Sequence, residues 1–218
     1  MIFLLTSAGF TNRTISNALL DLTRRPFKEI SLAFIPTAAN MWDDDKSWLI
    51  DDLYNTKKLG FSSIDIVDIS ALPNAMWEKR LNVVDIIMVG GGNTYDLIYW
   101  INKSGFSKTI EVFLKTKVYV GISAGSIVMA KNLALSQSKK LYYEDRGKID
   151  NEKGLGFVDF HIRPHLNSPD FPNVREKYLK EQAKKILEPI YAIDDDTAIK
   201  VVNGKIEVIS EGKWIRFN

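Results

Sequence analysis

The sequence predicts an α/β fold in which a mostly parallel sheet is covered by helices on both faces. Short apolar runs rich in β-branched residues alternate with amphipathic stretches up to about residue 132. Two of these runs end in glycine-bearing turns, at the edge where open parallel sheets place their ligands. A chain of 218 residues without a linker suits one domain, so we expect a single domain over residues 1–218.

Five runs are predicted as strands of this sheet. Each is short and mostly apolar, as strands that are buried on both faces are. They are Met1–Leu5, Ser31–Ile35, Ser63–Ile69, Val84–Val89 and Lys117–Ile122.

Helices are predicted between these strands, where apolar residues recur at helical spacing. In the first such stretch Ile15 and Leu19 are four residues apart and fall on one face. The predicted helices cover Thr14–Leu22, Asp45–Leu59, Tyr95–Ile101 and Ile110–Leu114.

The pattern changes after about residue 132. The polar stretch Asn132–Gly156 is predicted as irregular or hairpin structure at the surface. A strand over Phe157–Arg163 and a helix over Val174–Ile186 follow. Three runs are expected to close the fold as short antiparallel strands, the last two joined by an Asn203-Gly204 turn. These runs are Tyr191–Ile193, Ala198–Val202 and Ile206–Ile209.

The composition excludes several classes of protein. With 29 Lys+Arg against 27 Asp+Glu, the chain lacks the basic excess of a nucleic-acid-binding protein. Zero cysteines exclude disulfides, thiolate zinc sites, iron–sulfur clusters and a cysteine nucleophile. No apolar run reaches the ~18 residues of a membrane span, and the N-terminus has no secretory pattern. We therefore expect a cytoplasmic protein that binds neither nucleic acid nor membranes.

The most specific motif is the G-x-S-x-G sequence at Gly121–Gly125. It lies directly after a predicted buried strand and directly before a helical run, which is the strand–turn–helix context of a nucleophile elbow. The tight turn needs small neighbours and holds the serine hydroxyl clear of the sheet. This pattern predicts that Ser123 is a nucleophile; the alternative is a glycine-rich turn without chemistry.

A second glycine turn, Gly90–Thr94, follows the strand Val84–Val89. It matches neither a dinucleotide fingerprint, which would need glycine where Tyr95 stands, nor a Walker loop. It is better interpreted as a backbone N–H cradle for a small anion or an oxyanion, with a plain turn as the alternative.

A serine nucleophile needs a base, and His161 and His165 are the only histidines in the chain. Pro164 cannot donate to a strand ladder, so the strand should end there. That leaves His165 on the loop side, and we favour it as the base over His161.

Three acids at Asp194–Asp196 follow the candidate base in sequence, and one of them could orient its ring. An acidic turn or a metal cluster are the alternatives, although the spacing is not that of a calcium loop. A further acidic run, Asp43–Asp45, precedes a predicted helix and suits the positive end of its dipole.

Taken together, these motifs resemble the dipeptidase E family of serine peptidases, which includes aspartyl dipeptidases and cyanophycinases. The shared features are Gly-Gly-Gly-Asn-Thr at 90–94, G-x-S-A-G at 121–125, Pro-His at 164–165 and I-D-x-D-T-A at 193–198. They occur in the family's order and run over nearly the whole chain.

The resemblance implies a three-layer sandwich like that of class I glutamine amidotransferases, a flavodoxin-like arrangement. It implies Ser123 as nucleophile, His165 as base and Asp195 as the third member of the triad. Gly91 and Ala124 would supply the oxyanion-hole N–H groups.

Part of the family pattern is not matched. Some relatives are assigned an acid about fifteen residues after the nucleophile, where this chain has Ser138, and relatives often carry Glu at the position of Asp195. Asp170 is the next candidate for the orienting acid.

The function expected is that of a serine exopeptidase, similar to a dipeptidase, which hydrolyses small peptides through an acyl-enzyme. Gly92, Asn93 and Arg175 are the expected substrate-binding residues, and aspartyl specificity is not assigned. No metal or cofactor is expected, and a homodimer is left open. The alternatives are a cyanophycinase-like amide hydrolase and a catalytically silent binding protein on the same fold.

Overall fold

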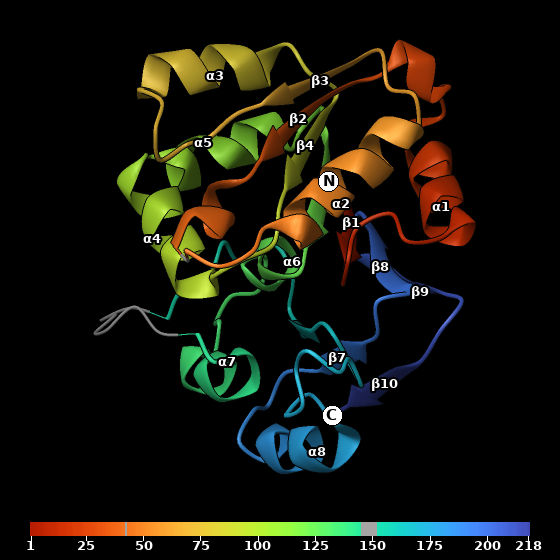
Figure 1. Cartoon of the computed structure of the whole chain (residues 1–218), viewed down its shortest axis with the longest axis vertical. Coiled ribbons are helices and arrows are strands. Elements are labelled where there is room, and N and C mark those ends of the chain that lie inside the picture. The colour runs from red at the N-terminus through yellow and green to blue at the C-terminus, as the bar shows by residue number, and fades with distance from the viewer. Residues whose placement is uncertain (42, 145–151) are drawn as a thin grey trace.

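The computed structural model of the chain describes residues 1–41, 43–144 and 152–218. A seven-stranded sheet forms its centre, with the strand order β3-β2-β4-β5-β1-β8-β9 (Figure 1). The first five of these strands are parallel, and β8 and β9 run antiparallel to β1 and to each other. The strands are β1 (Ile2–Thr6), β2 (Ser31–Ile35), β3 (Ser63–Ile66), β4 (Ile86–Val89), β5 (Val118–Ile122), β8 (Thr197–Val202) and β9 (Lys205–Ser210).

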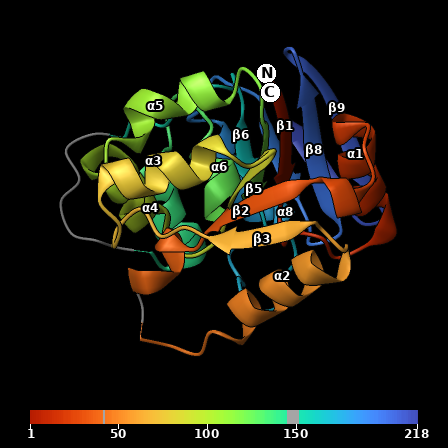
Figure 2. The ribbon, with the colours of Figure 1, turned by 90° about the horizontal axis from the view of Figure 1, so that it is seen from above.

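Helices cover both faces of this sheet, because its central strands are apolar on both sides. Leu4 packs in the cluster with α1 (Arg13–Thr23) and α2 (Ser47–Lys58). Its neighbour Leu5 belongs to the cluster on the opposite face. Figure 2 shows α1 and α2 on one side of the sheet and further helices on the other. These are α3 (Asn74–Asn82), α4 (Thr94–Lys103), α5 (Phe106–Phe113) and the short α6 (Ala124–Ile127). The sequence-based prediction of the fold class is confirmed.

A smaller three-stranded sheet lies beyond one end of the central sheet (Figure 1). Its order is β10-β7-β6, with β6 and β7 parallel and β10 antiparallel to β7. It consists of β6 (His161–Arg163), β7 (Ile190–Ile193) and β10 (Trp214–Phe217), and is accompanied by α7 (Leu135–Tyr142) and α8 (Glu176–Ala183). Two 3₁₀ turns, η1 (Phe27–Glu29) and η2 (Thr37–Met41), complete the elements.

The five parallel strands and the β8–β9 hairpin are where the sequence predicts them. Asn203 and Gly204 both have positive φ, at 50° and 83°, as their hairpin turn requires. The prediction for Tyr191–Ile193 is wrong in one respect, because β7 joins the second sheet and pairs parallel with β6.

Other local predictions are also corrected. The stretch Asn132–Gly156, expected to be irregular or a hairpin, contains α7, and its residues 145–151 lie outside the described part of the chain. The buried face of α7 includes Gln137 and Ser138 beside Leu141, so the apolar periodicity is weak. Strand β6 is shorter than Phe157–Arg163, since Val158 forms only an isolated bridge. Helix α3 and strand β10 were not predicted.

The turn after β5 packs so closely against β4 that it accepts no side chain at Gly125. A Cβ atom there would lie 2.1 Å from the carbonyl oxygen of Val89. By contrast, a Cβ at Gly60 would meet nothing within 4 Å, although Gly60 has a φ of +78°.

We predict that Gly125→Ala lowers the free energy of unfolding by roughly 3 kcal/mol, the upper part of the range for overpacking a close contact. Gly60→Ala should cost only about 1 kcal/mol, which is the penalty for an L-residue in the left-handed region. Urea unfolding of the two variants measures both. Equal losses would show that the packing against Val89 is not the constraint described.

Candidate active site

The site lies where three neighbouring parallel strands end. In the strand order, β5 lies between β4 and β1, so their carboxyl ends meet at one edge of the sheet. Gly90–Gly92 follow β4, Ser123 follows β5 and Ser7 follows β1 directly. This arrangement brings together the two glycine-bearing turns and Ser7, a serine that the sequence motifs did not indicate.

Ser123 occupies a strained position between β5 and α6. Its φ of 47° and ψ of −108° lie outside the regions that L-residues favour. The strain follows from a turn so tight that a Cβ at Gly121 would lie 2.7 Å from the carbonyl oxygen of Gly125. The side chain of Ser123 is half-exposed at the sheet edge, as the nucleophile-elbow motif predicts.

His165 reaches this serine from the second sheet. It follows β6 after Pro164, with a positive φ of 64°, and its Nε2 lies 2.9 Å from the Ser123 Oγ. The ring stacks on Phe171, with 4.7 Å between the centroids. The backbone beside it is fixed because the Leu166 N–H donates to the Ile193 carbonyl at 3.0 Å.

Asp195 binds the other side of the ring, with 2.7 Å between its Oδ1 and the His165 Nδ1. Burial alone would raise the pKa of this carboxyl. The hydrogen bond from His165, the His165 charge and the hydrogen bond from Ser7 outweigh burial, and the pKa lies below its ordinary value. Asp195 therefore stays ionised beside the ring, where a carboxylate stabilises an imidazolium.

Ser7 is a further member of this network, and it is fully buried. Its hydroxyl donates to Asp195 Oδ1 at 2.7 Å and accepts from the His165 backbone N–H at 2.8 Å. It thus fixes the carboxylate and the backbone of the histidine at once. Its position directly after β1, at the same edge as the other turns, is the only signal of it in the sequence.

The two amides expected in the oxyanion hole flank Ser123. A Cβ at Gly91 would lie 3.3 Å from the Ser123 Cβ, so the Gly91 backbone is in close contact with the serine. Ala124 follows the serine and begins α6. Across residues 1–41, 43–144 and 152–218, neither amide N–H donates to another group. Both are therefore available to a ligand.

Two residues expected to bind substrate lie elsewhere. Asn93 is fully buried and caps α4, accepting from the Asp96 N–H at 2.9 Å. Arg175 donates to the backbone carbonyls of Ser168, Phe171 and Val174 and fixes their loop. Neither lines the pocket described below, whereas Gly92 does.

The remaining polar residues that the sequence analysis considered have structural contacts. His161 is buried in β6, with its Nε2 3.7 Å from Glu188, and burial lowers its pKa to about 4. Asp194 accepts from Thr197 and from backbone N–H groups, and Asp196 accepts from Asn12. The described residues contain no group of three His, Asp or Glu side chains suited to a metal ion.

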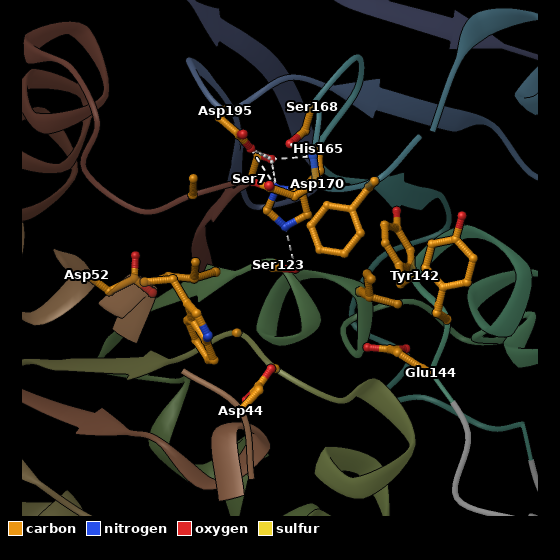
Figure 3. A pocket seen from close by; sticks show the side chains of 18 residues that line it. Ser7, Asp44, Asp52, Ser123, Tyr142, Glu144, His165, Ser168, Asp170 and Asp195 are labelled. Carbon is orange, nitrogen blue, oxygen red and sulfur yellow. Dashed lines mark hydrogen bonds and ion pairs between the residues drawn. The ribbon is translucent and has the colours of Figure 1, made fainter. Parts of the chain in front are cut away.

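A pocket of about 520 Å³ opens over Ser123 (Figure 3). Its walls carry Trp48, Ile122, Ile127 and the aromatic side chains Tyr142, Tyr143 and Phe171. Five of its lining residues carry carboxyl groups, and no described Lys or Arg lines it. The carboxylates are Asp44, Asp52, Glu144, Asp170 and Asp195.

Two of these acids have strongly perturbed pKa values. Burial, with the charges of Asp51 and Asp195, raises the pKa of Asp52 to about 7. Burial raises the pKa of Glu144 to about 8, although hydrogen bonds from Thr94 and the charge of Arg163 act in the opposite direction. Sequence reasoning did not select either residue, because each reaches the pocket from a helix or loop remote from the motifs. Asp44, expected only at a helix start, also lines the pocket.

The fold defines the class: an α/β three-layer sandwich of the class I glutamine amidotransferase-like type, with Ser123, His165 and Asp195 hydrogen-bonded in a chain at the edge of its sheet. Residues 2–209 match peptidase family S51, and the chain belongs to this family. It is therefore a peptidase, and the resemblance to dipeptidase E is confirmed.

Known proteins of similar sequence carry related names. An uncharacterized peptidase of Pasteurella multocida, PM1590, is 28% identical, over 82% of this chain and 84% of its own. A peptidase E of Nostoc sp. is 25% identical, over 82% of this chain and 72% of its own.

Solved structures support the fold. A Listeria monocytogenes protein assigned as a peptidase E superposes with a TM-score of 0.80 at 24% identity, covering 97% of this chain and 98% of its own. A peptidase from an acI-B1 Actinobacterium gives a TM-score of 0.68 at 16% identity, covering 99% and 96%. Among the described residues, no helix has the length and apolar character to span a membrane.

The geometry predicts the tautomer of His165. Because Nδ1 faces a carboxylate and Nε2 faces a hydroxyl, the neutral ring should carry its proton on Nδ1. Nitrogen NMR of histidine-labelled protein measures this directly, since the chain has only two histidines and His161→Gln assigns them. Asp195→Asn should shift the proton towards Nε2, and the matched control Asp170→Asn should not. A ring protonated on Nε2 in the unaltered protein would contradict the arrangement.

Proposed function

We propose that this peptidase is a serine exopeptidase that hydrolyses small peptides through an acyl-enzyme on Ser123. One observation supports this most: Ser123, His165 and Asp195 form a continuous hydrogen-bonded chain, with links of 2.9 and 2.7 Å. Nucleophile, base and orienting acid in this order are the parts that serine-dependent acyl transfer requires.

The reaction begins when the Ser123 Oγ attacks the carbonyl carbon of the scissile amide. His165 Nε2 takes the hydroxyl proton, and Asp195 stabilises the imidazolium that results. The oxyanion of the tetrahedral intermediate accepts from the Gly91 and Ala124 N–H groups.

The intermediate then collapses. The C–N bond breaks, and the imidazolium gives its proton to the leaving amine, which leaves an ester on Ser123. A water molecule, deprotonated by the same Nε2, attacks the ester and releases the acid. Ser123 regains its proton, so the groups return to their starting state.

The pocket itself favours a short peptide with a free amino terminus. A volume of about 520 Å³ suits a ligand of a few residues. Asp52 lines this pocket, and its carboxyl group is half-buried with like charges near it. An α-ammonium group would relieve that repulsion, which a blocked or internal peptide could not do. The pocket lining carries carboxyl groups and no described Lys or Arg, which does not favour a substrate with an aspartyl side chain.

The other interpretations find less support. A silent binding protein has no need of a buried Ser7 that holds both Asp195 and the backbone of His165. No observation favours a cyanophycin-like branched substrate over an ordinary peptide.

We predict that Ser123→Ala lowers kcat/KM for dipeptides by at least roughly 10³-fold, because members of a triad act as one unit. His165→Ala should lose about as much, since the serine then has no base. His161→Gln should lose far less, because His161 contacts Glu188 and lies outside the pocket. Steady-state assays of the three purified variants test this. A larger loss in His161→Gln than in His165→Ala would contradict the assignment of His165 as the base.

A second prediction concerns Asp52. Its pKa of about 7 lies above that of an unperturbed carboxyl group, so Asp52 is mostly charged only above about pH 7. The ammonium group of a peptide loses its proton near pH 8. The ratio of kcat/KM for a free peptide to that for its N-acetylated form should therefore fall as the pH drops from 7.5 to 6. This ratio cancels the titration of the catalytic groups.

Asp52→Asn should make the ratio independent of pH and lower it about tenfold at pH 7.5, as expected for a hydrogen bond to a charged group. Asp159→Asn, which removes the charge of an exposed carboxylate outside the pocket, is the control. Equal cleavage of the free and acetylated peptides would overturn the exopeptidase assignment.

A further inference from the structure

The carboxyl group of Glu144 lacks a partner for one of its oxygens. The residue follows α7, is 6% exposed and points into the pocket (Figure 3). Its Oε1 accepts from the Thr94 N–H at 2.8 Å and from the Thr94 hydroxyl at 3.1 Å, at the beginning of α4. Its Oε2 is buried and has no hydrogen-bond partner among the described residues.

An unpaired buried carboxylate oxygen is costly unless a ligand satisfies it. Thr94 holds the group in place without neutralising it, and burial raises its pKa to about 8. Arg163 is the cation whose charge acts on Glu144, but it does not line the pocket. No Lys or Arg of the described pocket lining pairs with the carboxyl group, so a cation from a ligand is needed to satisfy it.

The walls beside Glu144 are apolar. Ile127, Tyr142, Tyr143 and Phe171 line the same pocket, and Tyr142 is buried. An aliphatic stem suits such walls, and a charged end group suits the carboxylate. In Figure 3 Glu144 and Asp52 lie on different sides of Ser123. Asp52 can therefore attract the amino terminus of a peptide while Glu144 attracts one of its side chains.

We propose that Glu144 binds the ammonium or guanidinium group of a basic side chain, so that the substrates are short peptides containing Lys or Arg. This inference rests on the proposed function for its catalytic readout. Glu144 would then determine substrate specificity, because its carboxylate attracts basic side chains and repels acidic ones.

The test compares Lys with norleucine, which has the same stem without the charge, in Lys-Ala, Nle-Ala, Ala-Lys and Ala-Nle. Arg-Ala distinguishes the guanidinium from the ammonium group, and Asp-Ala supplies the opposite charge. In the unaltered protein kcat/KM should favour Lys over norleucine at one of the two positions by roughly 10-fold or more, the range of a hydrogen bond between charged groups.

Glu144→Gln keeps the shape and can still accept from Thr94, but it loses the charge. It should bring the Lys-to-norleucine ratio to within about twofold of unity and leave norleucine peptides nearly unaffected, since an uncharged stem gains nothing from the lost charge. Asp159→Asn removes the same charge from an exposed carboxylate paired with Lys131 outside the pocket, and should leave the ratio unchanged. An unchanged ratio in Glu144→Gln, or a preference for Asp-Ala, would overturn the proposal.

A binding measurement keeps this test independent of catalysis. Lysinamide should bind Ser123→Ala protein at least about tenfold more tightly than norleucinamide, for the same reason. Calorimetry at pH 7 in buffers of different ionisation heat should also show proton release on binding, because Glu144 exchanges its proton for a cation. Equal affinity of the two amides would contradict the proposal even if Glu144→Gln does not fold. If norleucine peptides are hydrolysed and Lys peptides are not preferred, only this inference is refuted. If lysinamide binds tightly but no peptide is hydrolysed, only the proposed function is refuted.

Discussion

The hydrogen-bonded chain from Ser123 through His165 to Asp195 depends on how the two sheets meet. Ser123 ends a strand of the central sheet, whereas His165 follows a strand of the smaller one. Asp195 lies on the connection between β7 and β8, where the chain passes from the second sheet to the first. Ser7, after β1, donates to Asp195 and accepts from the backbone N–H of His165. A shift of one sheet against the other would separate the serine from its base, so the packing between sheets sets the geometry of the site.

Carboxyl groups in one pocket have different environments, and these determine what each can do. Asp195 is partly buried but receives hydrogen bonds from His165 and Ser7, which favour its ionised form. Asp52 and Glu144 are also desolvated, but no cation of the described pocket lining compensates them, and their pKa values rise to about 7 and about 8. The first of these groups is satisfied within the protein, while the other two are suited to positive charges of a ligand. Desolvation acts on all three carboxyl groups, and the compensation that Asp195 receives from His165 and Ser7 separates it from Asp52 and Glu144.

Much of the site could be predicted from the sequence, because its central residues lie in local motifs. The strand–turn–helix around Ser123, the glycines after β4 and the proline before His165 each indicate their structure without reference to distant residues. Ser7, Asp52 and Glu144 could not be found in this way, since only the tertiary arrangement brings them to the pocket. Arg175 was expected at the substrate because it is near His165 in sequence, but its guanidinium is occupied by backbone carbonyls. Helix α7 was missed because a face that buries Gln137 and Ser138 has little apolar periodicity.

The central claim is that Ser123 is a nucleophile activated by His165. Mass spectrometry of the protein treated with a fluorophosphonate tests it most directly, because the reagent forms a covalent bond only with an activated hydroxyl group. We predict one adduct per chain on the peptide that contains Ser123, and a much slower reaction in His165→Ala. An unmodified Ser123 in folded protein, or labelling at the same rate without His165, would contradict the account.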